Sequence, residues 1–403
     1  MTSPADAACA RAWQRVGWLL FAVGWGANHF APLLLVYRQR LALDAAAPAL
    51  LFGMYALGLV PGLLLAGPLS DRRGRRAVVL PSAVAALVAS VGLGCFGDNF
   101  AGLLGGRLLY GLGAGGVMSA GAVWVIELSH RAAPGAGARR ATISLSSGFG
   151  LGPLVSGVLA QYAPAPTVAP FAVHVALLGS VLVIAWRTPD TGDRAAGRPA
   201  PPLLRIELDR AGWRQFLRGV APMAPFVFGF PAIALAAMPS MLTGSLGRAP
   251  MAYTGVLCVI ALSMGVVFQP LTRRFEPAFA ARLGLIFGAA GLALGALAVG
   301  WQAHGLLLAV APILGAAYGV CMTAGLLTVQ RLARPDARGG ITGLYYVLTY
   351  LGFAAPYLLA LATRVTAPAS ALWATAAVVV ATASVLPRSR SSTRGIDLSS
   401  SNT

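Results

Sequence analysis

An aspartate and four arginines lie within six residues in the segment GPLSDRRGRR, which runs from Gly67 to Arg76. Side chains of opposite charge at this spacing form ion pairs that are made and broken without any covalent step. The segment follows an apolar run from Pro48 to Ala66, and glycines frame it. Gly67 would let a helix end approach its neighbour closely, and Gly74 would permit a tight turn. These residues therefore offer a reversible charge cluster between packed helices.

Asp71 has two kinds of partner available in such a cluster, a facing helix N-terminus or the nearby arginines. A plain basic loop would need only the arginines. The segment resembles the signature loop of the major facilitator superfamily, written G-x-L-a-D-r-x-G-r-k/r. The matching positions are Gly67, Leu69, Asp71, Arg72, Gly74, Arg75 and Arg76. The resemblance implies a gating role for all of these except Leu69.

Glu127 stands near the end of the fourth apolar stretch, in VWVIELSHRAAPGAGARRA. The resemblance implies that this acid pairs with Arg76 or Arg75 and belongs to the gate. An ordinary interfacial glutamate is the alternative. The second half of the chain carries QPLTRRF, with Arg273 at the position aligned with Asp71. We therefore expect an asymmetric gate.

Arg107 lies inside the fourth apolar stretch, in GRLLYGLGAGG. An arginine within a membrane is a functional candidate by default. This segment resembles the arginine motif of the family's fourth helix, which implies a part in proton coupling. The alternative is that the side chain extends to the membrane surface.

Asn28 and His29 fall near the middle of the first apolar stretch, GWGANHFAPLLLVY. Pro32 removes a helical hydrogen bond from the Asn28 carbonyl, so a kink is expected there. An amide and an imidazole at such a kink predict polar substrate contacts. Histidine also titrates near physiological pH, which makes His29 a candidate proton carrier. A purely structural His29 is the alternative.

Small residues recur every fourth position in the fifth stretch, SLSSGFGLGPLVSGVLA. Such stripes let helices approach closely in lipid. Gly148, Gly152, Pro153 and Gly157 also resemble the G-x-x-x-G-P-x-x-G-G motif of the superfamily's antiporters, with Ser156 in place of one glycine. The resemblance implies a role in gating and favours export.

Aromatic and methionine side chains gather in the fourth, tenth and eleventh stretches. Tyr346 and Tyr350 share a helix face at a spacing of four. Such side chains form adaptable apolar walls around a ligand, although each one alone fits helix packing or a lipid-facing surface equally well. The predicted substrate contacts are Asn28, His29, Met118, Tyr318, Met322, Tyr346 and Tyr350.

The elements that must position these residues are membrane helices. The chain has 403 residues, of which 57% are hydrophobic and 10% charged, and its mean hydropathy is +0.74. A soluble globular protein carries roughly 25% charged residues, so the bulk of this chain must lie in lipid. A spanning helix needs about 20 mostly apolar residues. Twelve stretches qualify: 17–37, 48–67, 77–97, 101–126, 141–162, 168–186, 217–239, 251–271, 279–300, 304–328, 340–361 and 367–386.

The basic residues orient these spans. All 30 are arginine, and placing the N-terminus in the cytoplasm puts most of them in cytoplasmic segments. This bias predicts a multi-pass protein of the cell membrane, plasma or inner, with both termini cytoplasmic. The net charge of +18 is thus mainly a topology signal, and we expect no nucleic-acid partner. The five arginines that this orientation does not place in cytoplasmic segments are Arg38, Arg40, Arg107, Arg248 and Arg364.

The two halves of the chain resemble each other at an offset of roughly 200 residues, and internal symmetry of this kind is typical of transporters. GVMSAG at 116–121 aligns with GVCMTAG at 319–325. We expect an all-α membrane protein of twelve helices in two pseudo-symmetric six-helix halves. The predicted domains are a cytoplasmic tail (1–16), the first half (17–186), a cytoplasmic linker with an interfacial amphipathic segment (187–216), the second half (217–386) and a second tail (387–403).

These features predict a secondary transporter that works by alternating access. The leading hypothesis is proton-coupled efflux of small amphipathic organic compounds, because the sequence resembles the drug and metabolite exporters of the superfamily. Uptake of a sugar or organic acid on the same fold is the alternative. No catalytic motif is present, and the cysteines lack metal or disulfide spacing. We therefore expect no enzyme, cofactor or metal site, and a monomer whose partners are substrate, protons and lipid.

Overall fold

The computed structural model describes residues 4–130, 132–191, 208–242, 246–332 and 338–387, with side chains described from residue 12 onward except at 338 and 339. These residues form helices and no strand, which confirms the predicted all-α fold. Within them, eleven helical spans are long and apolar enough to cross a membrane. A twelfth apolar helix, Ala169–Ala185, is shorter and stands where the sixth span was predicted.

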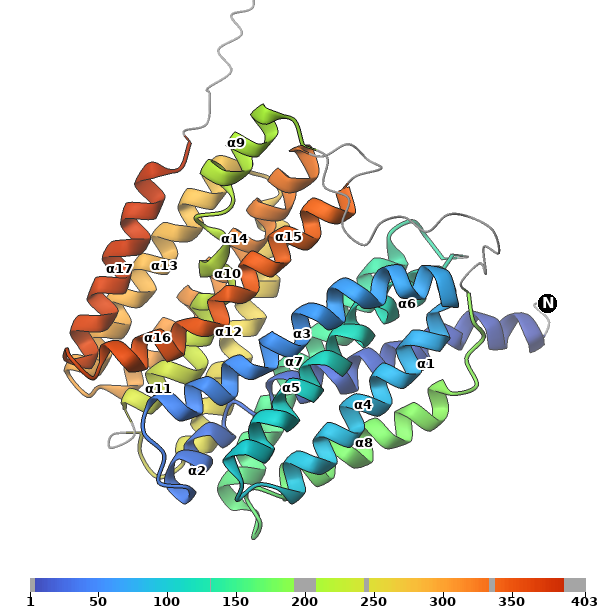
Figure 1. Ribbon diagram of the computed structural model, residues 1–403, viewed down its shortest axis with the longest axis horizontal. Coiled ribbons are helices and arrows are strands. Elements are labelled where there is room, and N and C mark those ends of the chain that lie inside the picture. Colours follow the sequence, from blue (N-terminus) through green and yellow to red (C-terminus); the bar gives the residue numbers. More distant parts are fainter. Residues whose placement is uncertain (1–3, 131, 192–207, 243–245, 333–337, 388–403) are drawn as a thin grey trace, which may run out of the picture.

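The first bundle contains the helices up to α8, drawn blue to green in Figure 1. Its elements are α1 (Pro4–Asn28), α2 (Leu33–Arg40), α3 (Ala46–Arg73), α4 (Arg75–Cys95), α5 (Phe100–Gly116), η1 (Val117–Gly121), α6 (Ala122–Leu128), α7 (Ala136–Tyr162) and α8 (Ala169–Ala185).

The second bundle contains the remaining helices, drawn yellow-green to red in Figure 1. Its elements are α9 (Arg210–Gly219), α10 (Ala224–Ala232), η2 (Ile233–Ala237), α11 (Met238–Met241), α12 (Pro250–Thr272), α13 (Pro277–Gly300), η3 (His304–Leu306), α14 (Leu307–Leu332), α15 (Arg338–Tyr350), η4 (Leu351–Ala354), α16 (Ala355–Ala362) and α17 (Pro368–Val385).

The two ends of the molecule differ. We call the end that carries α6 and α9 the linker end, and the opposite end, with α2 and α11, the far end. Figure 1 shows the bundles in contact around α2, α3, α11 and α16 and diverging toward α6 and α9. The division of the chain into two halves, 17–186 and 217–386, that move relative to each other remains a prediction.

Several spans are interrupted, and the interruptions surround the centre of the molecule. The first span breaks after Asn28 because Pro32 lacks an N–H, and the Ala31 N–H bonds the Asn28 carbonyl instead. The fourth and seventh spans each contain a π-helical turn, η1 and η2. The eleventh passes through the tight 3₁₀ turn η4. Such irregular turns re-aim side chains and often occur at functional sites.

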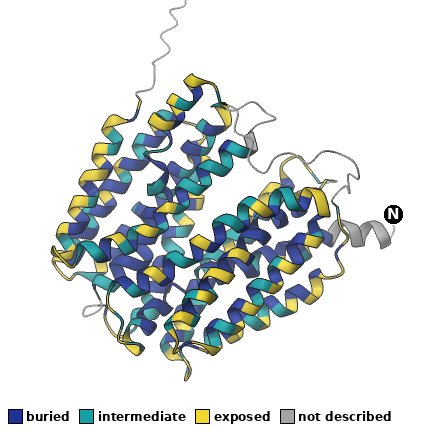
Figure 2. Ribbon diagram, viewed as in Figure 1, coloured by how far each residue is buried: buried dark blue, intermediate teal, exposed yellow. Residues whose placement is uncertain are grey.

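The outer surface of both bundles is apolar, as a lipid-facing surface must be. Figure 2 shows buried residues along the interior and exposed ones on the outward helix faces. Large apolar side chains stand on that surface, for example Leu57, Val183 and Trp186, which are 63%, 71% and 52% exposed. In water this surface would be an aggregation hazard, whereas in a bilayer it meets acyl chains.

Two predicted boundaries need correction. The segment GPLSDRRGRR is not a loop, because α3 continues to Arg73 and α4 begins at Arg75, so Gly74 alone joins them. In the amphipathic linker segment residues 208 and 209 are not helical, and the helix begins at Arg210, capped by Asp209, whose side chain accepts from the Gly212 N–H. The earlier part of that segment, up to residue 207, lies outside the described residues.

Candidate functional site

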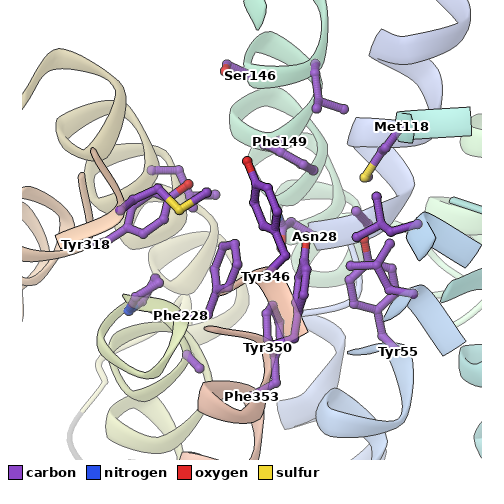
Figure 3. Close-up of a pocket in the computed structure, with 18 of the residues that line it drawn as sticks. Asn28, Tyr55, Met118, Ser146, Phe149, Phe228, Tyr318, Tyr346, Tyr350 and Phe353 are labelled. Atoms are coloured by element: carbon purple, nitrogen blue, oxygen red, sulfur yellow. The ribbon is translucent and has the colours of Figure 1, made fainter. Parts of the chain in front are cut away.

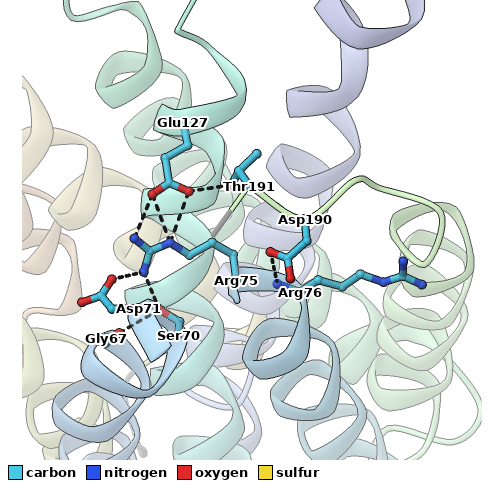
Figure 4. Close-up of polar contacts among 8 residues, drawn as sticks. All are labelled: Gly67, Ser70, Asp71, Arg75, Arg76, Glu127, Asp190 and Thr191. Carbon is cyan, nitrogen blue, oxygen red and sulfur yellow. Dashed lines mark hydrogen bonds and ion pairs between the residues drawn. The ribbon is translucent and has the colours of Figure 1, made fainter. Parts of the chain in front are cut away.

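The charge cluster at the linker end is centred on Arg75 (Figure 4). Its guanidinium donates to the Glu127 carboxylate, with Nη2 2.8 Å and Nε 3.1 Å from Oε1. Nη1 donates to the Ser70 hydroxyl at 2.6 Å and to the Asp71 carboxylate. The Arg75 side chain is only 11% exposed, whereas that of Asp71 is 54% exposed. Of the two arginines predicted to meet Glu127, Arg75 does so.

The segment that leaves α8 covers this cluster. The Thr191 hydroxyl donates to Glu127 Oε2 at 2.5 Å, and Asp190 Oδ1 accepts from the backbone N–H of Arg76 at 3.3 Å. Figure 4 shows Asp190 above the start of α4 at Arg76 and Thr191 beside Glu127 of α6. The start of the linker is thus part of the cluster, which the sequence alone did not indicate.

Gly74 is the position where the cluster requires glycine. Its φ of +94° is unfavourable for any residue with a side chain. A Cβ added there would also lie 2.1 Å from Asp190 Oδ2. Gly67 is less constrained, since its added Cβ would lie 3.3 Å from the Ser119 hydroxyl. Arg72, which was also predicted to take part in gating, is exposed on the final turn of α3.

The small-residue stripe of α7 seats this helix against α1. A Cβ added at Gly148 would lie 2.1 Å from the Phe21 carbonyl oxygen, and one at Gly152 would lie 2.3 Å from that of Trp25. These two glycines therefore allow backbone-to-backbone contact inside the first bundle.

The other two members of the predicted motif join the bundles. A Cβ added at Gly157 would lie 2.6 Å from the Met251 carbonyl oxygen, and one at Gly255 would lie 2.6 Å from that of Pro153. Near the ends of the same helices, Gln161 Oε1 accepts from the Met251 N–H at 3.2 Å. The crossing of α7 and α12 is thus a close contact between the bundles at the far end.

Further polar contacts close the far end. Arg38 Nη1 donates to the Ser240 carbonyl at 2.7 Å, and Arg364 Nη2 pairs with Asp44 Oδ2 at 2.6 Å. The backbone N–H of Ala47 and the Arg364 guanidinium hold the pKa of Asp44 below its usual value. Where both partners are described, no hydrogen bond or ion pair joins the two bundles at the linker end.

Arg107 is buried in the first bundle at 1% exposure, so its side chain does not extend to the membrane surface, which was the alternative to a functional role. Its Nε donates to the Leu51 carbonyl at 3.2 Å. The guanidinium carbon lies 4.5 Å from the Phe30 ring centroid and 4.8 Å from that of Tyr55. Nη2 has no hydrogen-bond partner among the described residues. A buried cation with an unused donor is costly and is retained in membrane proteins mainly for function.

His29 lies in the interior of the first bundle and does not line the central cavity, so the geometry gives no support to its predicted substrate contact. Its ring meets those of Phe171 and His174 edge to face, each at 4.9 Å between centroids. Nδ1 has no partner among the described residues. The backbone carbonyl, freed by the helix break, accepts from the Ser156 hydroxyl at 2.6 Å.

His174 has a hydrogen-bond partner at each ring nitrogen. Its Nε2 lies 3.0 Å from the Ala22 carbonyl, so this nitrogen donates. Its Nδ1 lies 3.0 Å from the Ser90 hydroxyl, which is also 3.0 Å from the Ala86 carbonyl. The single Ser90 proton can point to either acceptor. Both hydrogen bonds of the imidazole therefore survive whether Nδ1 accepts or donates.

A cavity of about 480 Å³ lies between the bundles at their centre. Figure 3 shows side chains from both bundles around it, with Tyr318 and Phe228 on one side and Tyr55 and Met118 on the other. The predicted substrate contacts that line it are Asn28, Met118, Tyr318, Met322, Tyr346 and Tyr350. Met118 reaches it from the π-helical turn η1.

Sequence reasoning missed several lining residues. Phe228 and Phe353 stack on Tyr350 with centroid distances of 4.7 and 5.9 Å, and Gln269 contributes an amide. Phe228 comes from the run PFVFGFP, in which every second residue is aromatic and periodicity singles out none. Conversely Tyr345, beside Tyr346, points away and donates to the Cys321 carbonyl at 3.2 Å.

Comparison with known sequences agrees with this arrangement. The sequence profile of the Major Facilitator Superfamily matches residues 16–356. Multidrug resistance protein MdtL from several strains of Escherichia coli is 38% identical over 85 residues, which are 20% of this chain and 22% of that protein. The chain thus matches about a fifth of the length of these curated relatives.

Solved structures share the fold. A POT family transporter in complex with 5-aminolevulinic acid superposes with a TM-score of 0.77 at 10% identity, over 93% of this chain and 95% of that one. A D-xylose-proton symporter gives 0.69 at 17% identity, over 94% and 97% of the two chains. The apolar helices of the described residues, the central cavity and the profile match lead to one assignment: the chain belongs to the major facilitator superfamily and is a multi-pass membrane protein.

Proposed function

We propose that this transporter exports small amphipathic organic compounds in exchange for protons, by alternating access. The observation that carries the proposal is the central cavity, which both bundles line and which direct contacts close at the far end. A cavity at the interface of two repeats is where a rocking-bundle transporter binds its substrate. We place the protein in the plasma or inner membrane with both termini and the linker end cytoplasmic, acting as a monomer.

Two sets of contacts would alternate in this cycle. At the far end, the Asp44–Arg364 pair and the crossing of α7 and α12 close the cavity to the outside in the described state. At the linker end, the residues around Arg75 would form the opposing gate. Asp71 is half exposed and, among the described residues, pairs with Arg75 alone, so it is available to the second bundle when that end closes.

For proton coupling we assign the buried polar group that contains Arg107, His29 and His174. Each described Asp or Glu lies in a loop or in the terminal turn of a helix, so no described carboxylate is at membrane depth. The imidazole of His174 keeps both hydrogen bonds with one proton or two. The Arg107 guanidinium would repel a bound proton and so favour its release, which a cycle of loading and unloading requires.

Export is favoured over uptake by two observations. Gly157, from the segment that resembles the antiporter motif, contributes to the contact that closes the far end. The short match to MdtL, a protein named for multidrug resistance, points the same way. A sugar transporter needs many hydrogen-bonding side chains in its site, whereas the described lining here is mostly apolar and aromatic.

The test uses inverted membrane vesicles that are energised so that their interior is acidic, with a pH-sensitive dye. A neutral aromatic compound, an organic cation and a sugar are added in separate experiments. Each compound that the protein exports should collapse the pH gradient, and the others should not. The effect should require the protein and should be much slower in Glu127→Gln. If no compound acts in this orientation and a sugar or organic acid drives proton entry into right-side-out vesicles, the protein is an uptake symporter.

A further inference from the structure

The walls of the central cavity are flat. Phe228 and Tyr350 stack with ring centroids 4.7 Å apart and planes inclined by 17°. Tyr350 also stacks on Phe353 at 5.9 Å and on Tyr346 at 6.5 Å, with both pairs inclined by 28°. These nearly parallel rings come from α10, α15 and η4, which contact one another in the second bundle. They present extended π-faces, against which a planar ring packs better than a branched or globular group.

The described lining carries no charge. None of its residues is Asp, Glu, Arg or His, although residues from both bundles contribute. A charged ligand would lose its hydration here without gaining a counter-ion, which is unfavourable. A cation would regain only part of this loss from an aromatic ring. It would also meet the field of Arg107, whose guanidinium lies 4.8 Å from the ring of the lining residue Tyr55.

The cavity does contain unused neutral hydrogen-bonding groups. The hydroxyls of Tyr318, Tyr346 and Tyr350 make no hydrogen bond with any described residue, nor do the side-chain amides of Asn28 and Gln269. These residues line the cavity, so their polar groups can pair with a ligand or with water. Hydroxyl and amide groups pair well with neutral donors and acceptors on a ligand.

We infer that the compounds carried by this protein are uncharged, planar aromatic molecules with one or two neutral hydrogen-bonding groups, such as an amide or a phenol. Stacking on Phe228 and Tyr350 holds the rings, and the unpaired hydroxyls and amides fix their orientation. This inference rests on the proposed export function and narrows it, because organic cations, carboxylates and sugars are excluded as main substrates. The volume of about 480 Å³ suits a compound of two or three rings.

The experiment compares probes of one shape and three charges. Binding of para-phenylbenzamide, para-phenylbenzoate and N-methyl-para-phenylpyridinium to the purified full-length protein in lipid nanodiscs is measured by calorimetry. The neutral amide should bind at least tenfold more tightly than either ion. Equal or tighter binding of the cation or the anion overturns the inference, and so does a lack of amide binding at millimolar concentration.

Two variants show whether the stacked rings are responsible. Phe228→Leu should weaken amide binding roughly tenfold, the size expected when one good ring stack is lost. Phe226→Leu is the matched control on the same helix, because Phe226 stacks on Phe230 at 5.9 Å and does not line the cavity. If the two variants weaken binding equally, the amide is held elsewhere and the inference fails.

The same probes separate this inference from the export proposal. Proton-linked export of the cation, with no effect of the amide, would support the export function and overturn the inference about charge. Tight binding of the amide without any proton flux would support the inference and overturn the antiport mechanism.

Discussion

The Arg75 guanidinium joins the carboxylate of Glu127, 52 positions away along the chain, to that of Asp71 on the preceding helix. One buried cation thus holds the ends of α3, α4 and α6 together at the linker end. Because Arg75 is 11% exposed, removing one of its partners leaves a largely desolvated charge, which costs more than breaking a surface pair.

We expect Glu127→Gln to lower the transport rate roughly tenfold, the size expected when a charge-assisted hydrogen bond is weakened. Proton-linked uptake into inverted vesicles measures this, with protein amount checked by immunoblot. Arg73→Gln is the control, since Arg73 is exposed and lies outside the contacts of the cluster. Equal loss in both variants would indicate a general charge effect and contradict the gate.

Gly74→Ala should destabilise the linker end by about 1–3 kcal/mol, because a side chain is strained at positive φ. It also displaces Asp190, whose carboxylate occupies the space of the new methyl group. The residues after α8 should then become more sensitive to limited proteolysis.

Gly135→Ala provides the comparison for Gly74. Its φ is also positive, +78°, but nothing lies within 4 Å of the added Cβ. Gly135→Ala should therefore destabilise the protein through backbone strain but should not make the residues after α8 more sensitive to proteolysis. If both variants expose the linker equally, the contact with Asp190 has no role in holding it.

Gly157→Leu should separate α7 from α12 and open the far end, because the Met251 carbonyl fills the space that a side chain needs. Transport should fall at least tenfold while membrane insertion stays normal. Gly150→Leu on the same helix is the control, since nothing lies within 4 Å of its added Cβ. An active Gly157→Leu protein would show that this close contact is not needed.

The Asp44–Arg364 pair should resist acid. Because its hydrogen bonds hold the Asp44 pKa below the usual value, the carboxylate stays ionised as pH falls. The contribution of the pair is present above the usual pKa and is lost only as pH drops through the lowered one. Acidifying the outside from about pH 7 to about pH 5 should therefore leave the far end closed, given the reference pKa near 4.

Spin labels at Gln39→Cys and Val365→Cys would measure the opening of the far end. Asp44→Asn should lengthen the distance between them at every pH. Asp98→Asn, which breaks the Arg40 ion pair inside the first bundle, should not. Opening of the unaltered protein at about pH 5 would refute the assignment.

His174→Asn should abolish accumulation driven by a pH gradient and leave substrate exchange across the membrane intact. The reason is that the proposed proton site, His174, lies in the interior of the first bundle, away from the lining of the cavity. His130→Asn, at an exposed position of the linker end, is the control. If the variant keeps proton-driven accumulation, the proton binds elsewhere.

The sequence determined the class of this protein. Low charge and long apolar runs require membrane helices, and the number and order of the spans follow from run length alone. The spacing of Gly67, Asp71, Gly74 and Arg75 indicated a charge cluster, because those residue types are not needed in a plain basic loop. Most of the predicted cavity residues also line the cavity, since unusual residues within apolar helices tend to face the interior of the protein.

Tertiary structure decided which side chains meet. A helical period places His29 beside Asn28 but does not say which neighbour each one faces, and the break after Asn28 turns His29 into the first bundle. Periodicity likewise could not separate Tyr345 from Tyr346, or Phe228 from its aromatic neighbours. The contacts of Asp190 and Thr191 with the charge cluster join segments more than 60 positions apart. Such contacts depend on how helices pack in three dimensions, and local patterns of residue type do not encode them.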